Sequence, residues 1–549
     1  METLQLVYWL LFVVIVWYFS ALPGNILAAS KTGLPMVISP VDPDTPIWLV
    51  LSSMFQPQLE AHLPGFAYDW IKLTIFGWEF RERWSSTIEK LGKSFIIVTP
   101  GRNAIWTADP QAMNDVLLRR KDFLQLELAS KMLGLFGMSL TASDAETWQR
   151  HRRATAPILN ERIMAAVWQE TLEQTQEMID EFTDQGSSSR ADTNEAIEGI
   201  RIIAINVIGS IVYGSRSSWK QTIRREGAPT GHSLTFIDAL STVIDNFIVA
   251  VFMPVHLLSR SWMPMPAQKL GISMQEFSSY AKEFIAEQRT RSETSNSLLG
   301  NLVRYADQHK LDSIQTKSSL YLSEDEIIGN LFNFTVAGFD TTATTTAYSL
   351  LALVLEPQWQ EWLIEEIDKT DALHKSSDYG NVFPASYETL RLYTPVMHIT
   401  RRVVQPQTTP FSISPGTSIF IAPSLTHVCP EYYGSDSLTF RPSRWLENGT
   451  IVDPPKGAFL PWSGGPRHCP GTKMSQVEFV AVLRQTFSNW RLRIAQREGE
   501  SEMQARERLL GLIKESQPKV TQQLRRPDNV WLRFVKREKA EAVVVNSSD

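Results

Sequence analysis

The chain has 549 residues, of which 43% are hydrophobic and 20% charged, and this composition excludes a disordered or low-complexity protein. Its net charge of −6 excludes a global basic field that would recruit nucleic acid. Two cysteines in so long a chain exclude a disulfide-stapled secreted scaffold and a cysteine-rich zinc module.

The first predicted element is an apolar run over residues 4–22 that Pro23-Gly24 ends. As a helix this run is about 28 Å long, close to the thickness of a bilayer core. A cleaved secretory signal is the alternative, but Glu2 precedes the run, no basic residue does, and the run is longer than a usual signal core. Lys31 follows it, which favours a cytosolic body. We therefore expect a single-pass membrane anchor at residues 1–22.

Residues 23–60 contain six prolines and a second apolar patch at 47–55, and they are predicted to form a stiff hinge with the patch on the membrane surface. Residues 61–536 show no further spanning segment, repeat or interdomain linker. They are predicted to form one large, mostly α-helical domain with small β-sheets, whose strands include 94–99, 104–107 and 418–421. Residues 537–549 are predicted to be a loose tail.

Two segments of the predicted domain combine arginine with an aromatic or acidic partner. Trp148-Gln-Arg-His-Arg152 places an indole and a guanidinium one helical turn apart, so both can contact one anion. Glu388-Thr-Leu-Arg391 can form a fork-to-fork ion pair along one helix face. Alone, each pattern is more often a stacked or solvated pair on a helix surface.

A long helix is predicted between the capping box Ser323-Glu-Asp-Glu326 and Pro357, about 33 residues or 50 Å. It contains Ala337-Gly-Phe-Asp-Thr-Thr342, whose mid-helix glycine costs about 1 kcal/mol relative to alanine. Thr341 can donate a hydrogen bond back to an earlier carbonyl and bend the axis. Without further context, a kinked core helix explains this segment as well.

The densest pattern is Pro461-Trp-Ser-Gly-Gly-Pro-Arg-His-Cys-Pro-Gly471, followed by a predicted helix over 473–490. Gly465 and Gly471 bracket Cys469 and allow backbone turns that a side chain would block. Such turns can direct amide N–H groups at a thiolate, and Arg467 can pair bidentately with a carboxylate. A lone cysteine argues against zinc. A buried structural cysteine is the alternative, which the surrounding glycines, arginine and prolines disfavour.

This loop resembles the heme-binding loop of the cytochrome P450 superfamily, Phe-x-x-Gly-x-Arg-x-Cys-x-Gly. The match covers Trp462, Gly465, Arg467, Cys469 and Gly471, with Trp462 in place of the usual phenylalanine. The resemblance implies that Cys469 is the axial thiolate ligand of heme b iron and that Arg467 contacts a propionate. Thiolate donation favours cleavage of the O–O bond, and an indole beside the sulfur can alter the redox tuning.

The other motifs match the family in order, and the resemblance gives each a role. Trp148 and Arg152 are implied heme-propionate contacts, as is Arg401, for which the adjacent Arg402 is the alternative.

In the long helix, Gly338 is implied to open space for O2, Thr341 to orient water at the distal oxygen, and Asp340 to relay protons. Glu388 and Arg391 are implied to form a buried cluster with Arg444, which lies in Phe440-Arg-Pro-Ser-Arg-Trp445. Nearby carbonyls are then expected to accept the remaining guanidinium N–H groups.

The fold and function implied are those of a membrane-bound heme-thiolate monooxygenase of the P450 fold that oxidises a hydrophobic small molecule with O2. The likeness to fungal microsomal members of secondary metabolism implies a secondary-metabolite substrate and an endoplasmic reticulum membrane with the catalytic domain in the cytosol. Candidate substrate-contacting segments are 124–140, 232–258 and 394–399.

No flavin or nicotinamide motif is evident, so NADPH electrons are expected from NADPH-cytochrome P450 reductase, with cytochrome b5 as a second candidate donor. Arg150, Arg153 and Lys473 are candidates for a basic docking face. Two alternatives stay open: an isomerase, dehydratase or peroxygenase on the same fold, and a non-catalytic heme-binding membrane protein. The Asp340–Thr341 pair favours the monooxygenase.

Overall fold

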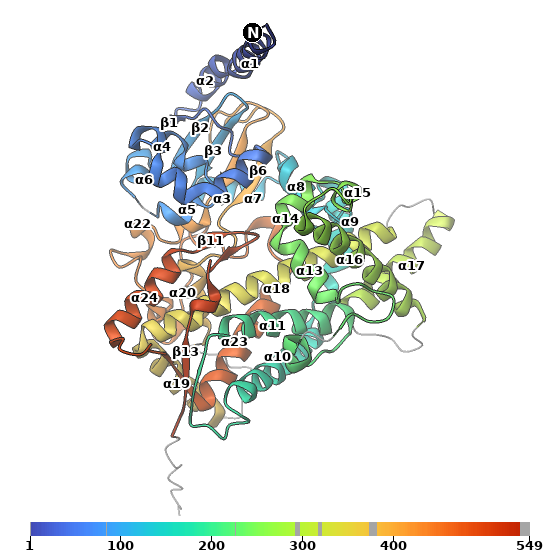
Figure 1. Cartoon of the computed structure of the whole chain (residues 1–549), viewed down its shortest axis with the longest axis vertical. Coiled ribbons are helices and arrows are strands. Elements are labelled where there is room, and N and C mark those ends of the chain that lie inside the picture. Colours follow the sequence, from blue (N-terminus) through green and yellow to red (C-terminus); the bar gives the residue numbers. More distant parts are fainter. Residues whose placement is uncertain are drawn as a thin grey trace, which may run out of the picture.

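The computed structural model describes residues 2–83, 85–224, 227–290, 297–316, 321–372 and 382–538 (Figure 1). Its longest described helix is α18 (Glu324–Leu355), which has 32 residues. The predicted capping box is present, because Glu326 N–H donates to Ser323 Oγ at 3.2 Å and Ser323 N–H donates to Glu326 Oε2 at 2.8 Å. The predicted long helix is therefore confirmed, with its C-terminal end two residues before Pro357.

Helices surround α18 in the larger part of the molecule (Figure 1). α11 (Ala196–Ile208), α20 (Val382–Leu392) and α23 (Thr472–Asn489) contact α18 directly, and α10 (Glu161–Phe182) packs on α11 and α23. Nearly every side chain of α18 from residue 342 to 355 is buried. A helix that is apolar all round belongs in a core, so the composition of this segment fixes its central position.

A six-stranded sheet forms the smaller part of the molecule, on the side where the N-terminus lies (Figure 1). Its strands, in spatial order, are β1 (Met36–Ile38), β2 (Ser94–Val98), β3 (Asn103–Thr107), β7 (Ser418–Ile421), β6 (Ile399–Val403) and β4 (Phe123–Leu124). β3 is buried along its whole length and pairs antiparallel with β2 and parallel with β7. The three strands predicted from sequence are confirmed to within one residue at each end.

Residues 23–60 differ from the predicted hinge. They contain α2 (Leu22–Ser30), β1 and α3 (Pro46–His62). β1 pairs parallel with β2 in the main sheet, and Asn25 Nδ2 donates to Thr99 O at 2.8 Å. Pro23 and Pro46 lie in the first turn of their helices, where the missing N–H of proline is harmless. The sheet therefore begins at residue 36, before the domain boundary predicted at residue 61.

The N-terminal helix α1 (Glu2–Phe19) projects away from the body (Figure 1). A turn at Ser20 separates it from α2, so the break comes before the predicted Pro23-Gly24. Residues 12–30 are long and apolar enough to be a candidate membrane span, and Trp9 and Trp17 are 68% and 74% exposed. A second stretch, 196–213, passes the same test of length and composition but is mostly buried in the core.

The remaining described helices and strands are α4 (Gly65–Ile71), α5 (Trp78–Arg81), α6 (Ser86–Leu91), α7 (Pro110–Leu118), α8 (Glu127–Leu133), α9 (Ala145–Thr155), β5 (Arg190–Thr193), α12 (Trp219–Arg224), α13 (Phe236–Asp245), α14 (Phe247–Phe252), α15 (Val255–Leu258), α16 (Met265–Thr290), α17 (Leu298–Thr316), α19 (Pro357–Ala372), α21 (Pro423–Thr426), α22 (Pro430–Tyr433), β8 (Leu446–Glu447), β9 (Thr450–Ile451), β10 (Trp490–Ile494), α24 (Glu502–Lys514), β11 (Gln517–Pro518), β12 (Gln522–Gln523) and β13 (Leu532–Lys536). Of the predicted tail, residues 539–549 lie outside the described residues.

Candidate active site

The loop that carries Cys469 lies immediately before α23. Gly465 has a φ of 64°, and a Cβ there would lie 2.6 Å from the carbonyl oxygen of Leu117. Gly471 has a φ of −86°, and a Cβ there would lie 3.8 Å from Cys469 Sγ, an ordinary contact. The steric need for glycine that the sequence suggested is therefore present at Gly465 and absent at Gly471.

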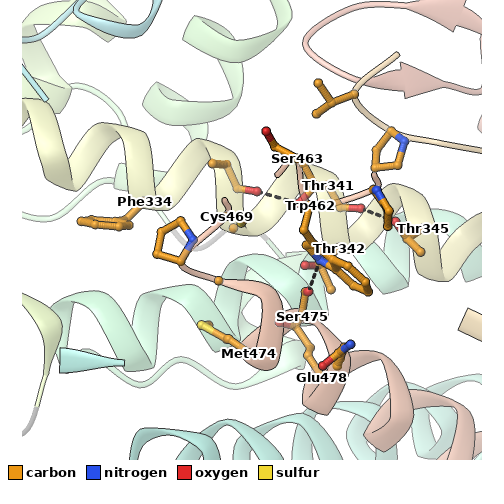
Figure 2. Close-up of a pocket in the computed structure, with 18 of the residues that line it drawn as sticks. Phe334, Thr341, Thr342, Thr345, Trp462, Ser463, Cys469, Met474, Ser475 and Glu478 are labelled. Carbon is orange, nitrogen blue, oxygen red and sulfur yellow. Dashed lines mark hydrogen bonds between the residues drawn. The ribbon is translucent and has the colours of Figure 1, made fainter. Parts of the chain in front are cut away.

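Backbone and side-chain hydrogen bonds hold this loop around the sulfur. Cys469 N–H donates to Trp462 O at 2.9 Å, and Thr472 Oγ1 donates to Cys469 O at 2.8 Å. The Trp462 indole N–H donates to Ser475 Oγ at 3.0 Å, which fixes the ring (Figure 2). Burial raises the pKa of the Cys469 thiol, while the Gly471 amide and the Arg152 charge act in the opposite direction. A cation bound at the sulfur would complete the stabilisation of a thiolate.

Cys469 lines a cavity of about 320 Å3 together with residues of α18 (Figure 2). A second cavity, of about 390 Å3, lies beside it. Both have the size of small-molecule pockets. They share Leu140, Thr141, Val396, Ile399, Ser463, Arg467 and Pro470 as lining residues. The two cavities are therefore adjacent along these seven residues, and together they are called the hollow.

Gly338 and Thr341 of α18 both line the cavity that contains Cys469. A Cβ on Gly338 would lie 2.5 Å from Cδ1 at the end of the Ile208 side chain of α11, so a larger residue here would require that side chain to shift. Thr341 Oγ1 donates to Ala337 O at 2.7 Å, as predicted, and its oxygen remains able to accept a hydrogen bond from a group in the cavity.

Asp340 is not among the described residues that line this cavity. It is 1% exposed, and its carboxylate accepts hydrogen bonds of 2.6 Å from Thr521 Oγ1 and from Gln523 Nε2. Thr341 lines the cavity, whereas the Asp340 carboxylate is bound to the segment around β12. The role of Asp340 as a proton relay, which the resemblance implied, stays a prediction.

The four residues implied as propionate contacts, Trp148, Arg152, Arg401 and Arg467, all line the second cavity. Arg467 Nη2 donates to Asp144 Oδ1 at 2.6 Å, and its guanidinium carbon lies 5.2 Å from the Trp148 ring centroid. Burial and, to a smaller extent, the neighbouring Arg467 charge lower the pKa of Arg401 to about 10.

Arg401 rather than Arg402 faces the cavity. Within the described chain, no carboxylate lies within 4.0 Å of the guanidinium nitrogens of Arg401 or Arg152. Of these three arginines, Arg467 forms an ion pair with Asp144, which also acts electrostatically on Arg401, and no ion pair of Arg152 is found among the described residues. This positive excess fits a dianion at the edge of the hollow, as the two propionates of heme would supply.

Glu388 is the centre of a buried ion cluster. It is 0% exposed and accepts two hydrogen bonds of 2.8 Å from Arg391 and one of 2.9 Å from Arg444 Nε. Arg441 N–H and the Trp445 indole N–H also donate to it, at 2.8 and 2.9 Å. Carbonyl oxygens accept from Arg391 Nη1 and Arg444 Nη1, at 2.9 Å to His427 O and 2.8 Å to Tyr433 O. Arg444 Nη2 also donates to the Asp436 carboxylate, at 3.3 Å. The structure brings the three predicted residues together.

Several cavity residues were not singled out from the sequence. Phe334 of α18 and Ile208 of α11 line the first cavity, whereas the predicted segment 232–258 contributes only Phe247 and Ile248, to the second. Glu478 of α23 also lines the first cavity, and burial raises its pKa to about 8, so it is mostly neutral at pH 7. These positions read as ordinary core helix in the sequence, and only the packing brings them to the hollow.

The predicted basic docking face is largely neutralised. Arg150 Nη1 donates to Glu326 Oε2 at 2.8 Å, and Lys473 pairs with Glu161. Arg153 is exposed.

Comparisons with known proteins agree with this arrangement. The profile of the family described as Cytochrome P450 matches residues 70–521. A cytochrome P450 monooxygenase of the phomenoic acid biosynthesis cluster from Leptosphaeria maculans is 30% identical over 87% of this chain and 90% of its own length. Cytochrome P450 monooxygenase ORF6 from Penicillium roqueforti is 26% identical over 84% of this chain and 87% of its own.

The solved structure of a retinoic acid-bound cyanobacterial CYP120A1 has the same fold. It covers 82% of this chain and 94% of its own, with a TM-score of 0.63 and 16% identity. The fold, the family match and the cysteine beside an arginine-edged hollow together lead to one conclusion. The chain belongs to the cytochrome P450 family and is a heme-thiolate monooxygenase.

Proposed function

We propose that this protein oxidises a hydrophobic secondary-metabolite intermediate, by hydroxylation or a related O2-dependent reaction, with electrons that NADPH-cytochrome P450 reductase transfers from NADPH. The observation that carries the proposal is that Cys469 and Thr341 line the same cavity, which continues to an edge rich in arginine. Heme, when bound, supplies O2 activation and the oxidation itself.

In this proposal Cys469 holds the iron, Trp148, Arg152, Arg401 and Arg467 bind the propionates, and the loop residues Trp462, Gly465 and Gly471 shape the sulfur's surroundings. The three arginines neutralise the charge of the propionates, and the apolar cavity walls keep bulk water away from the reacting centre. Thr341 holds a proton-carrying water at the cavity through its hydroxyl oxygen.

Two findings support a secondary-metabolite substrate. The first is the name of the fungal relative, which places that relative in a biosynthesis cluster. The second is the cavity wall, to which Leu140, Ile399 and Phe334 contribute apolar surface. The candidate span at residues 12–30 supports a membrane anchor. We propose that this membrane is the endoplasmic reticulum and that the body lies in the cytosol, where the reductase and cytochrome b5 are the expected partners.

Replacing Thr341 tests the monooxygenase against the isomerase, dehydratase and peroxygenase alternatives. In Thr341→Ala, the ratio of product to NADPH consumed should fall about tenfold or more while peroxide rises, because positioned proton transfer contributes roughly 10²–10⁴ in rate. Product, peroxide and NADPH are measured with the same reconstituted reductase. Thr341→Ser retains the hydroxyl and should retain most of the coupling. Unchanged coupling in Thr341→Ala, or turnover without NADPH, would contradict the proposal.

Deleting α1 tests the anchor. Full-length protein should stay with membranes after an alkaline carbonate wash, whereas a form without residues 2–19 should be released, because it lacks the exposed apolar helix. Fractions are compared by immunoblot, and a form that lacks 539–549 is the matched truncation control. Retention of both truncated forms, or secretion of a processed full-length protein, would refute the anchor.

A further inference from the structure

The second cavity has a polar end at the sheet and α5. Glu79 of α5 lines it, is 0% exposed, and forms a hydrogen bond through Oε1 with His398 Nδ1. Aromatic rings enclose this pair: Trp106 stacks on Phe420 at 4.4 Å between centroids, and the His398 ring lies 5.3 and 5.4 Å from these two rings. The carboxylate is thus held in place inside an apolar wall.

Three buried polar atoms at this end have no hydrogen-bond partner within the part of the chain that the structure describes. They are Glu79 Oε2, Trp78 Nε1 and Trp106 Nε1. Such atoms are rare in folded proteins, because each has lost its bonds to water without a replacement. All three residues line the second cavity. Because these residues form the wall of one cavity, a polar group that enters the cavity can supply the missing partner.

The chemistry of the three atoms selects that group. Two are donors and one is an acceptor, and an alcohol hydroxyl donates one hydrogen bond and accepts two. A carboxylate offers acceptors only and would lie near the buried carboxylates of Glu79 and Asp44, which both line this cavity. Asp44, whose pKa burial raises to about 6, is mostly ionised at pH 7. An ammonium group offers donors only and would leave both indoles without an acceptor.

We propose that this end of the cavity is a substrate-anchoring subsite for a neutral alcohol hydroxyl, which donates to Glu79 and accepts from the indoles of Trp78 and Trp106. The inference rests on the proposed function, because the apolar body of the same molecule then extends along the hollow toward Cys469. His398 is a positioning residue, since it acts by holding Glu79.

The test is calorimetric binding to full-length holoenzyme of two probes, decan-1-ol and decyl methyl ether, which share an apolar chain. The wild type should bind the alcohol about tenfold more tightly, because the ether cannot donate to the Glu79 carboxylate. Glu79→Gln should reduce this preference, because a neutral amide oxygen is a weaker acceptor for the alcohol than a carboxylate. Trp106→Phe retains the stacked ring but loses a donor, so it should weaken both probes several-fold.

Glu502→Gln, an exposed glutamate at the start of α24, is the matched control and should change neither affinity. Equal affinity of the wild type for alcohol and ether would overturn the subsite and show that the orphan atoms bind water only. An unchanged preference in Glu79→Gln would overturn it as well. The reduced CO spectrum and NADPH turnover of the same preparations separate failure of the subsite from failure of the proposed function. If both are normal while the preference for the alcohol is missing, only the subsite proposal is wrong. If the wild type lacks the thiolate spectrum, the proposed function is wrong.

Discussion

Cys469→Ser should abolish the thiolate-type spectrum of the reduced, CO-bound protein and all NADPH-dependent product formation. A serine hydroxyl is a far weaker electron donor than a thiolate, and the red-shifted Soret band depends on sulfur donation. The substitution is nearly isosteric, and the loop's hydrogen bonds use backbone atoms of residue 469. We therefore expect the variant to fold and to retain the structure of the loop, but to lack the thiolate ligand.

The second cysteine provides the matched control for this experiment. Cys429 is buried at the start of α22, burial raises the pKa of its thiol, and it is not among the described residues that line either cavity. Cys429→Ser should retain the wild-type spectrum and heme content. A thiolate spectrum that persists in Cys469→Ser and disappears in Cys429→Ser would move the ligand assignment to Cys429.

Local sequence patterns predicted those parts of the fold that local forces determine. The long helix has a capping box at one end and proline after the other, and both features act within a few residues of themselves. The strands around 94–107 and at 418–421 are continuous apolar runs. The prolines of 23–60 misled the interpretation because proline also begins helices, and only the pairing of β1 with β2 shows that this segment belongs to the sheet.

The site could be predicted from sequence where a single motif fixes the geometry of neighbouring residues. It was less predictable where the packing of distant segments places the residues. The cysteine loop and the glutamate–arginine cluster are compact signals, and the structure brings their members together. Asp340 and Thr341 form one motif in the sequence, yet Thr341 lines the first cavity and Asp340 does not. The groups that bind Asp340 are Thr521 and Gln523, which lie nearly two hundred residues further along the chain. The polar end of the second cavity has no signal in the sequence, because Glu79 and His398 meet only through the fold.

Removing the Glu388 carboxylate should have the largest effect on stability. Glu388→Ala leaves the fully buried guanidinium of Arg391 and that of Arg444 without their shared anion, at a cost of about 3–5 kcal/mol. The free energy of unfolding of a whole domain is only about 5–15 kcal/mol. We therefore expect little soluble holoprotein, with low heme content and a lower urea midpoint for the fraction that folds.

Glu361→Ala is the matched control, because Glu361 forms the same forked pair with Arg491, at 2.7 and 2.8 Å, but is 40% exposed. Water and dissolved ions stabilise the charges of a surface pair when one partner is removed. The free energy of unfolding of this variant should therefore fall by about 1 kcal/mol or less. Both variants delete a carboxylate that forms a forked pair with an arginine, but the Glu388 pair is buried and Glu388 accepts three further hydrogen bonds. Equal losses for both would show that the Glu388 cluster contributes no more than a surface pair, whereas a large loss confined to Glu388→Ala identifies the buried cluster as a determinant of the fold's stability.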